Sequence, residues 1–395
     1  MVDVVLPDFM SVRSFQAAKR IVYGAKAIDR TGLEAKQLGL KNGLIVTDKT
    51  IEKTGLVEET RKSLENEGLK IDIFNKVEPE PRLDVADLVA ETARGASYDF
   101  VVGVGGGSAL DMAKVASIAM TNPDPIRQYL GLNKVKKDGV PKILIPTTAG
   151  TGSEVTNIAV VTLVDDEIKS GIVSPQLFAD VVIVDPMTTI TMPPKTTAGT
   201  GIDALSHAIE AIMSIQASPI TDVLALEAVS RIGKSLRIAY YQGDNLKARY
   251  DMSLAALMAG LAFGSAGVAG GHAAAYAYSV KYDIAHGVSC GIALPHIMRY
   301  NMPVCEEKLV LIAKALDEET AGLPVREAAC KAVTAVERLI QEVSLPTSLK
   351  SLGVPKADVA TLAADMLKSE RLLARQVRKI TMDDAIELMK RICGE

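Results

Sequence analysis

Short β-branched segments alternate with helix-like segments from about residue 20 to about residue 190, and this alternation restricts the fold more than any other feature of the sequence. Strand-like segments such as "NGLIVTD", "LKIDIFNKV" and "YDFVVGVGGG" are separated by helix-like segments such as "EETRKSLENEG" and "RLDVADLVAETARG". This pattern is typical of βαβ units that form a mostly parallel sheet. Further strands are expected in "PKILIPTT", "IAVVTLVD" and "DVVIVDP".

The pattern changes after "TMPPKTTAGTG", where apolar residues begin to recur every three or four positions and strand-like runs almost disappear. Pro193 and Pro194 mark the expected boundary between the two patterns, because proline is favoured at the first position of a helix. A chain of 395 residues is long enough to bury two cores. We therefore predict an α/β domain over residues 1–192 and an all-helical domain over residues 193–395.

The charge of the chain argues against a nucleic-acid partner. The formal net charge is −4, and the lysines and arginines are spread along the sequence instead of being gathered into basic blocks. A nucleic-acid-binding protein would need such a basic patch. Small molecules are therefore the expected partners.

Cysteine usage and hydropathy indicate a cytoplasmic protein that does not enter a membrane. The four cysteines are far apart and form no C-x-x-C pair, so reduced thiols are expected. The N-terminal "MVDVVLPDFMSVRSF" lacks the basic and apolar regions of a signal peptide. The most apolar stretch, residues 254–271, is rich in Gly and Ala, so we expect a tightly packed interior helix pair there.

A glycine-rich turn in "YDFVVGVGGGSALDMAK" predicts a phosphate-binding loop. Gly103, Gly105, Gly106 and Gly107 stand between a strand and a helix that is expected to begin near Ser108. Glycines allow close approach of the backbone to a pyrophosphate, and the N-terminus of a helix attracts anions. Ser108 replaces the third glycine of the G-x-G-x-x-G pattern, so a tight turn without a ligand is the alternative.

Two further segments suit a dinucleotide. Asp48 ends the strand "LIVTD", where it could accept hydrogen bonds from a ribose and repel a 2′-phosphate, which favours NAD over NADP. The alternative is that Asp48 caps the following helix. "IPTTAGTGSEVT" places Thr147, Thr148, Thr151 and Ser153 after another strand, where they are either cofactor contacts or a polar loop with local caps.

The four histidines of the chain suggest a metal site. Asp203 and His207 in "GIDALSHAIEA" are four residues apart, so both side chains lie on one face of a helix. His272 and His286 are separated by a helix and a loop. One carboxylate and three imidazoles bind a divalent transition metal, and both Fe(II) and Zn(II) accept this set. The alternative is three buried histidines with ordinary hydrogen bonds, and we expect that for His296.

The motifs, in their order, resemble those of the iron-containing (group III) alcohol dehydrogenase family. The resemblance rests on "VTDKT", "GVGGGSALDMAK", "IPTTAGTGSEVT", "MPPKTTAGTGIDALSHAIEA", "GGH" and "HGVSCGIALPH", which extend through nearly the whole chain. It implies an α/β N-terminal dinucleotide-binding domain and an all-α C-terminal metal-binding domain, a dehydroquinate synthase-like architecture. The cofactor and the metal are then expected in the cleft between them.

The resemblance also assigns residues. The implied metal ligands are Asp203, His207, His272 and His286, with Fe(II) favoured over Zn(II). The implied NAD-binding residues are Asp48, Gly107, Ser108, Thr147, Thr148, Val160 and Lys169. We also expect Gly105, Gly106, Asp111 and Thr151 to contact the cofactor. Relatives are commonly dimers, so a homodimer or a higher homo-oligomer is expected.

The chain departs from the family pattern at two positions. Many relatives have a second histidine four residues after His272, where this chain has Tyr276, so the path of the proton differs. We assign Tyr276 to orienting the substrate or to carrying its proton. Glu80 in "EPEP" stands where relatives often have asparagine, so contacts to the cofactor differ there.

The expected reaction is the oxidation of an alcohol or the reduction of an aldehyde. In this hypothesis the metal stabilises the alkoxide of a primary alcohol, which gives a hydride to C4 of the nicotinamide. A glycerol dehydrogenase-like enzyme for polyols or secondary alcohols is one alternative, and a non-catalytic nucleotide-binding module is another. A dehydroquinate synthase relative is disfavoured, because few basic residues accompany the metal motifs in the sequence.

Overall fold

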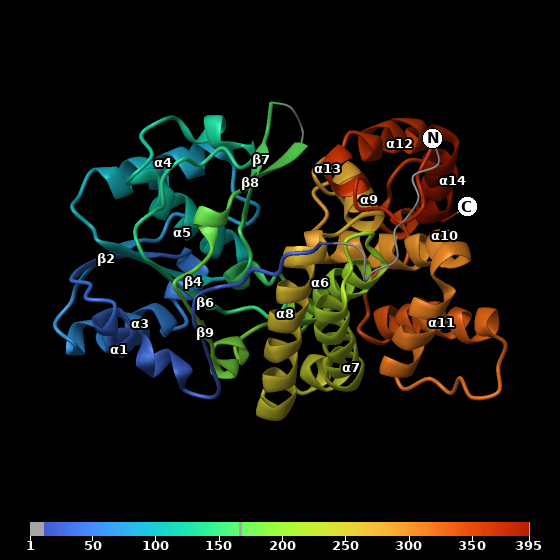
Figure 1. The fold of residues 1–395 in the computed structure, drawn as a ribbon, viewed down its shortest axis with the longest axis horizontal. Coiled ribbons are helices and arrows are strands. Elements are labelled where there is room, and N and C mark those ends of the chain that lie inside the picture. Colours follow the sequence, from blue (N-terminus) through green and yellow to red (C-terminus); the bar gives the residue numbers. More distant parts are fainter. Residues whose placement is uncertain (1–11, 166–167, 395) are drawn as a thin grey trace.

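The computed structural model describes residues 12–165 and 168–394, and it has two halves that lie side by side in Figure 1. One half contains a parallel sheet with helices, and the other is made of helices, which confirms the predicted fold class. Residues 1–11, on which the absence of a signal peptide was mainly judged, lie outside the described residues.

The main sheet has six parallel strands in the order β1-β9-β6-β4-β2-β3. The central strand β4 is buried along its whole length, as expected when helices cover both faces of a parallel sheet. The carboxyl ends of β2, β4 and β6 lie next to one another, so the loops that follow them share one edge. The strands are β1 (Ile21–Tyr23), β2 (Asn42–Val46), β3 (Lys70–Phe74), β4 (Phe100–Gly105), β6 (Lys142–Pro146) and β9 (Val181–Val184).

Side chains that alternate along each strand divide the core into two layers. Val101 and Leu144 belong to the cluster that contains residues of α4 and α5, whereas Val102 and Ile143 belong to the cluster that contains residues of α1 and α3. Each face of the sheet is therefore covered by a different pair of helices. The helices of this half are α1 (Thr31–Gln37), α2 (Lys49–Glu52), α3 (Leu56–Asn66), α4 (Leu83–Arg94) and α5 (Gly107–Ala119).

The predicted strand in "IAVVTLVD" exists, but it does not join the main sheet. It forms β7 (Ile158–Leu163), which pairs in an antiparallel manner with β8 (Ile168–Val173), and β8 also pairs with the short β5 (Gly131–Leu132). Alternating hydrophobicity predicts a strand but not the sheet that it enters. This small sheet positions Val160 and Lys169 at the site described below.

The second half is organised around α6, on which most residues are buried because α7, α8 and α10 all pack against it. The domain boundary that we propose after residue 192 lies in the connection between the 3-10 helix Pro186–Thr189 and α6. The helices are α6 (Pro194–Met213), α7 (Pro219–Tyr241), α8 (Leu246–Ala266), α9 (Gly270–Ser279), α10 (His286–Ala315), α11 (Val325–Glu342), α12 (Val359–Leu367), α13 (Glu370–Leu373) and α14 (Met382–Cys393).

Within the described residues, no single helix combines the length and the apolar character needed to cross a membrane. Helices α8 and α9 satisfy that test only as a pair, and the pair is bent by 103°. Most residues of both helices are buried in the core of the helical half. The bend brings the start of α9, with His272, to the site.

Candidate active site

A cavity of about 340 Å³ is lined by residues from both halves of the protein. It includes thirteen residues that the sequence singled out. These are Glu80, Gly107, Ser108, Asp111, Thr151, Ser153, Val160, Lys169, Asp203, His207, His272, Tyr276 and His286. Five other predicted cofactor residues do not line this cavity, namely Asp48, Gly105, Gly106, Thr147 and Thr148.

The glycine-rich turn is packed too closely for larger residues. Strand β4 ends at Gly105, which has a φ of 155°, and α5 begins at Gly107. A Cβ atom on Gly107 would lie 2.8 Å from the Cγ2 atom of Thr151 in the loop after β6. Glycine at this position therefore lets the start of α5 pack against Thr151, and Gly107, Ser108 and Thr151 all line the cavity. The N-terminus of a helix at a cavity suits a pyrophosphate.

Asp48 and the threonines lie beside this turn. The carboxylate of Asp48 accepts hydrogen bonds from the N–H groups of Thr50 and Ile51, at 2.7 and 3.0 Å, so it is the N-cap of α2. Both bonds use Oδ1, and Oδ2 lies towards Gly105. The capping role therefore leaves one oxygen for a ribose. Thr148 contacts the position where Gly106 would carry a Cβ atom.

A buried lysine that the sequence reasoning missed supports the floor of the cavity. Lys114 is fully buried on α5, and its Nζ atom donates to Ser153 Oγ at 2.7 Å and to the carbonyl of Ile158 at 2.6 Å. Asp111 lies 3.3 Å from the same ammonium group and accepts from the N–H of Val160 at 2.9 Å. These bonds join α5, the threonine-rich loop and β7 into one unit. The spacing of Asp111 and Lys114, three residues apart on a helix, was the available signal.

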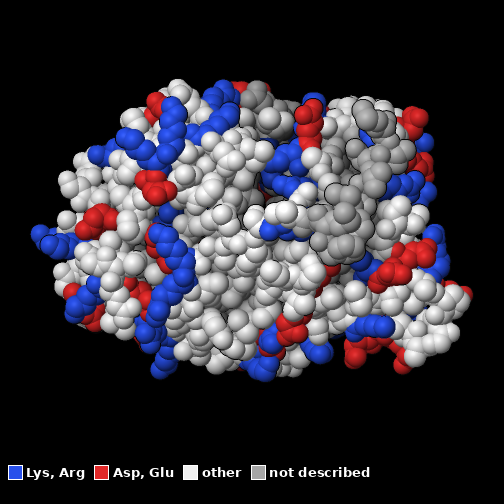
Figure 2. Space-filling view, viewed as in Figure 1, with Lys and Arg blue, Asp and Glu red and all other residues white. Residues whose placement is uncertain are grey.

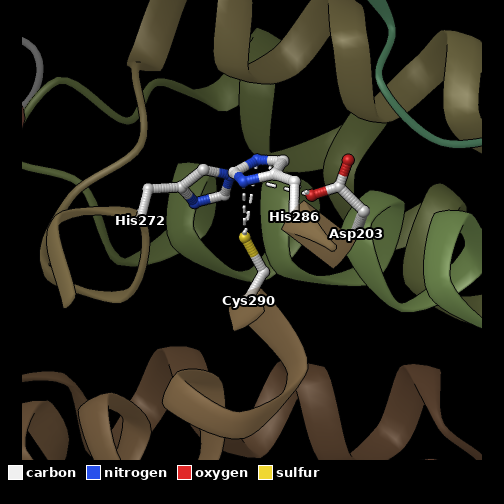
Figure 3. A group of neighbouring side chains, drawn as sticks. All are labelled: Asp203, His272, His286 and Cys290. Atoms are coloured by element: carbon white, nitrogen blue, oxygen red, sulfur yellow. Dashed lines mark hydrogen bonds and ion pairs between the residues drawn. The ribbon is translucent and has the colours of Figure 1, made fainter. Parts of the chain in front are cut away.

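The four predicted metal ligands come together from three helices, and Figure 3 shows three of them, Asp203, His272 and His286. Asp203 and His207 lie on α6, His272 on α9, and His286 is the first residue of α10. The Oδ1 atom of Asp203 is 3.9 Å from Nε2 of both His207 and His272 and 3.6 Å from Nε2 of His286. The ring of His207 stacks on that of His272, with centroids 4.7 Å apart.

Several atoms of this group are buried without a hydrogen-bond partner among the described residues. They are Asp203 Oδ1, His207 Nδ1 and His272 Nε2. Leaving such atoms unpaired is costly, so they indicate a ligand that the residues themselves do not supply. A carboxylate and neutral imidazoles that converge within about 4 Å fit a divalent transition metal.

The protonation states also suit a metal. Burial lowers the pKa of His207 to about 4 and that of His286 to about 3, so both imidazoles are neutral at physiological pH. Neutral imidazole is the form that binds metals. Burial alone would lower the pKa of His272 as well, but the charge and hydrogen bond of Glu210 raise it.

Cys290 is a second residue that the sequence reasoning missed. It follows His286 by four residues on α10, and its Sγ atom lies 3.6 Å from His286 Nε2. Asp203, His272, His286 and Cys290 each offer a ligand atom within 4.8 Å of the others. Burial raises the pKa of the Cys290 thiol well above its ordinary value, so the thiol stays protonated. The spacing of four residues from His286 was the signal for it.

Tyr276 lies at the side of the metal group. Its ring centroid is 5.6 Å from that of His286, and Lys169 Nζ lies 5.7 Å from the tyrosine ring centroid. Lys169 in turn forms an ion pair with Glu80 at 3.0 Å. Burial raises the pKa of Tyr276, which keeps its hydroxyl protonated and able to donate a hydrogen bond.

Two arginines also line the cavity, although the metal motifs themselves contain few basic residues. Arg371 belongs to α13 and Arg375 follows it. Neither arginine could be placed near the histidines from the sequence, because both lie more than eighty residues beyond His286. The structure therefore makes this cavity more basic than the motifs suggested.

Comparisons with known proteins identify the family of the chain. Residues 18–186 match the family model described as iron-containing alcohol dehydrogenase, and residues 197–393 match the C-terminal model of the Fe-containing alcohol dehydrogenase family. The chain belongs to the iron-containing alcohol dehydrogenase family. The resemblance inferred from the motifs is thus confirmed, and the chain is an alcohol oxidoreductase.

Individual relatives of this family are similar over most of the chain. Long-chain-alcohol dehydrogenase 1 of Geobacillus thermodenitrificans is 42% identical over 355 residues, which are 89% of each chain. The 1,3-propanediol dehydrogenase of Klebsiella pneumoniae is 40% identical over 88% of this chain and 90% of its own. A solved 1,3-propanediol oxidoreductase superposes with a TM-score of 0.93 at 36% identity, covering 97% of this chain and 100% of that one. Membership of this family implies NAD(H) and a divalent metal.

Proposed function

We propose that this iron-containing alcohol dehydrogenase uses NAD(H) and Fe(II) to interconvert a primary alcohol and its aldehyde. The observation that carries the proposal is the convergence of the Nε2 atoms of three histidines, His207, His272 and His286, on Oδ1 of Asp203. This buried oxygen has no hydrogen-bond partner among the described residues, and it lies at a cavity that the glycine-rich turn also lines. Zn(II) fits the same ligands. The ion would be held by Asp203, His207, His272 and His286.

Each residue of the site has a distinct task in this proposal. A bound divalent ion supplies a Lewis acid that polarises the C–O bond, and NAD(H) accepts or gives the hydride. Asp203 offsets part of the charge of the ion. Tyr276 donates a hydrogen bond to the substrate oxygen and orients it. The N–H groups at the start of α5 hold the pyrophosphate.

NAD is the proposed cofactor, with NADP disfavoured. Asp48 has one carboxylate oxygen that is not used for capping α2, and it follows β2 beside the glycine-rich turn. A carboxylate there accepts hydrogen bonds from a ribose and repels a 2′-phosphate. Thr147, Thr148 and Thr151 would line the same cofactor.

A diol or polyol is the second candidate substrate. Relatives carry the names of enzymes for long-chain alcohols, methanol, 1,3-propanediol and choline, so family membership alone does not identify the substrate. The solved 1,3-propanediol oxidoreductase is the specific support for a diol.

We also propose a cytoplasmic homodimer. The support is that the described cysteines form no disulfide bond, together with the commonly dimeric state of the family that the motifs resemble. Size-exclusion chromatography with light scattering measures the mass directly, and a monomer would contradict the proposal.

The decisive experiment measures metal content and turnover together. The purified protein is stripped with a chelator, reloaded with Fe(II) or Zn(II), and assayed for NAD reduction with alcohols and diols. We expect one ion per chain and activity only after reloading. A folded protein that binds neither NAD nor metal would overturn the proposal in favour of a protein that retains only the fold.

A further inference from the structure

Arg371 and Arg375 differ from the other described arginines in having no hydrogen-bond or ion-pair partner among the described residues. Every other arginine among residues 12–165 and 168–394 has a hydrogen bond, an ion pair or another electrostatic contact. No hydrogen bond or ion pair to a described residue exists for these two side chains, and both line the cavity of the active site.

Two unpaired guanidinium groups in one place are unfavourable on their own. The two residues are four positions apart, and their like charges repel. Burial lowers the pKa of Arg375, and the charge of Arg371 lowers it further. Arg371 is exposed, whereas Arg375 is half-buried, and a half-buried charge is normally paired. An anion bound between them would relieve their repulsion and compensate Arg375 for its loss of hydration.

The position of the pair is on the metal side of the cavity. A Cβ atom on Gly267 would lie 3.0 Å from Cγ of Arg375, and Gly267 immediately precedes the segment that leads into α9 and His272. The backbone of Arg375 is fixed by a hydrogen bond from the N–H of Ile215 to its carbonyl at 3.1 Å. Arg371 lies close enough to His272 and Tyr276 for its charge to act on both side chains.

The other charges of the cavity are already balanced. Lys169 pairs with Glu80, and Asp111 lies against Lys114. Asp203 belongs to the metal group. Figure 2 shows basic side chains gathered at the hollow between the two halves. Among the described lining residues, Arg371 and Arg375 are therefore the positive charges that remain without a counter-charge.

We propose that the physiological substrate carries a negatively charged group, a carboxylate or a sulfonate, at the end opposite its alcohol or aldehyde, and that Arg371 and Arg375 bind this group. Guanidinium groups bind both anions through paired, charge-assisted hydrogen bonds. The proposal rests on the proposed function, since it names the class of substrate for that same reaction.

The test compares aldehydes that differ in their terminal charge. The Fe(II)-loaded enzyme is assayed with NADH and either succinate semialdehyde or butanal, and then with either sulfoacetaldehyde or propanal. We expect kcat/KM to be roughly 10- to 100-fold higher for the anionic member of at least one pair, the range of a charged hydrogen bond. The two pairs distinguish a carboxylate from a sulfonate. The advantage should shrink at high salt, because salt screens the attraction.

Variants then assign the effect to the two arginines. Arg371→Gln and Arg375→Gln should each raise KM for the anionic aldehyde by about tenfold or more while leaving the neutral aldehyde and NADH within about twofold. Arg375→Lys should recover part of the loss, since it retains the charge. Arg391→Gln, which removes the same charge from an exposed pair on α14, is the matched control.

The outcomes separate this inference from the proposed function. Turnover of butanal without any preference for an anion would overturn the inference and leave the dehydrogenase intact. A rise in KM for NADH in both arginine variants would also overturn it, because the arginines would then bind cofactor phosphates. No turnover of any alcohol or aldehyde by the metal-loaded enzyme would overturn the proposed function. If the variants fail to fold, the preference and salt dependence of the unmodified enzyme still decide.

Discussion

Glu210 and His272 form a buried pair in which the carboxylate Oε1 lies 2.6 Å from the imidazole Nδ1. The same carboxylate accepts the backbone N–H groups of Ala269, Gly271 and His272 at 2.7, 3.0 and 3.1 Å, so it also caps the start of α9. A proton on Nδ1 that is donated to Glu210 leaves Nε2 free to bind a metal. Glu210 thus sets both the position and the tautomer of one proposed ligand.

Replacing Glu210 with glutamine should weaken metal binding by about 10- to 100-fold, the usual cost of losing a partner of a ligating histidine. The cause is a weaker acceptor for Nδ1–H and a lost negative charge beside the ion. Competition against a chelator of known affinity measures the change. Glu227→Gln, an exposed change on α7, is the control. Unchanged affinity in Glu210→Gln would show that His272 is held by the fold alone.

The sequence predicted the parts of this site that are local and missed those that depend on distant packing. Asp203 and His207 follow from helical spacing, and Glu210 continues the same face at the seventh residue, but a glutamate on a helix is ordinarily a solvated residue. Arg371 reaches the cavity only because α13 packs against α9. The same limit applies to the fold, because strand-like patterns predict β7 but not its place outside the main sheet.

His207 and Cys290 compete for the fourth ligand position, and substitution separates them. His207→Ala should reduce metal affinity by more than about 100-fold, which is more than the removal of a residue that only hydrogen-bonds to a ligand would cost. Cys290→Ser should retain the metal, because burial keeps the thiol protonated and a thiol is a poor ligand. The Co(II) form of the unmodified protein should show no sulfur-to-metal charge-transfer band. Such a band, lost in Cys290→Ser, would make Cys290 a ligand.

Tyr276→Phe tests how the tyrosine acts. Because burial raises its pKa, the hydroxyl stays protonated across the working pH range, and we expect it to orient the substrate. The variant should raise KM for the alcohol by roughly tenfold, which is the effect expected from the loss of one hydrogen bond. The shape of the pH–rate profile should not change. Steady-state kinetics from pH 6 to pH 10 measure both quantities. A displaced profile would show instead that Tyr276 carries the proton.

Asp48→Asn should change the choice between the two nicotinamide cofactors. Asparagine keeps the capping oxygen for Thr50 and Ile51 but removes the charge that repels a 2′-phosphate. We expect the ratio of kcat/KM for NADH over NADPH to fall by about tenfold, with a melting temperature close to that of the unmodified protein. Asp29→Asn, on the 3-10 helix Ala27–Arg30, is a control for loss of one charge. An unchanged ratio would remove Asp48 from the ribose site.

Glu154 should make the protein less stable as the pH rises. It lies in the 3-10 helix Ser153–Val155, is 2% exposed, and its Oε2 atom has no hydrogen-bond partner among the described residues. Burial raises its pKa from 4.5 to about 7, although the nearby charge of Lys114 acts in the opposite direction. The folded state therefore holds this proton more tightly than the unfolded state does.

The sign of the effect follows from that difference. Stability is full below pH 4.5, where both states are protonated, and it falls as the pH rises through 7, by up to about 3 kcal/mol. Glutamine stays neutral, so Glu154→Gln should match the unmodified protein near pH 4.5 and exceed it by up to that amount at pH 8. Urea unfolding at several pH values measures this, with the exposed Glu65→Gln as control. If Glu154→Gln is instead destabilised at pH 8, the ionised carboxylate is stabilised by Lys114, and the ion pair outweighs the cost of burial.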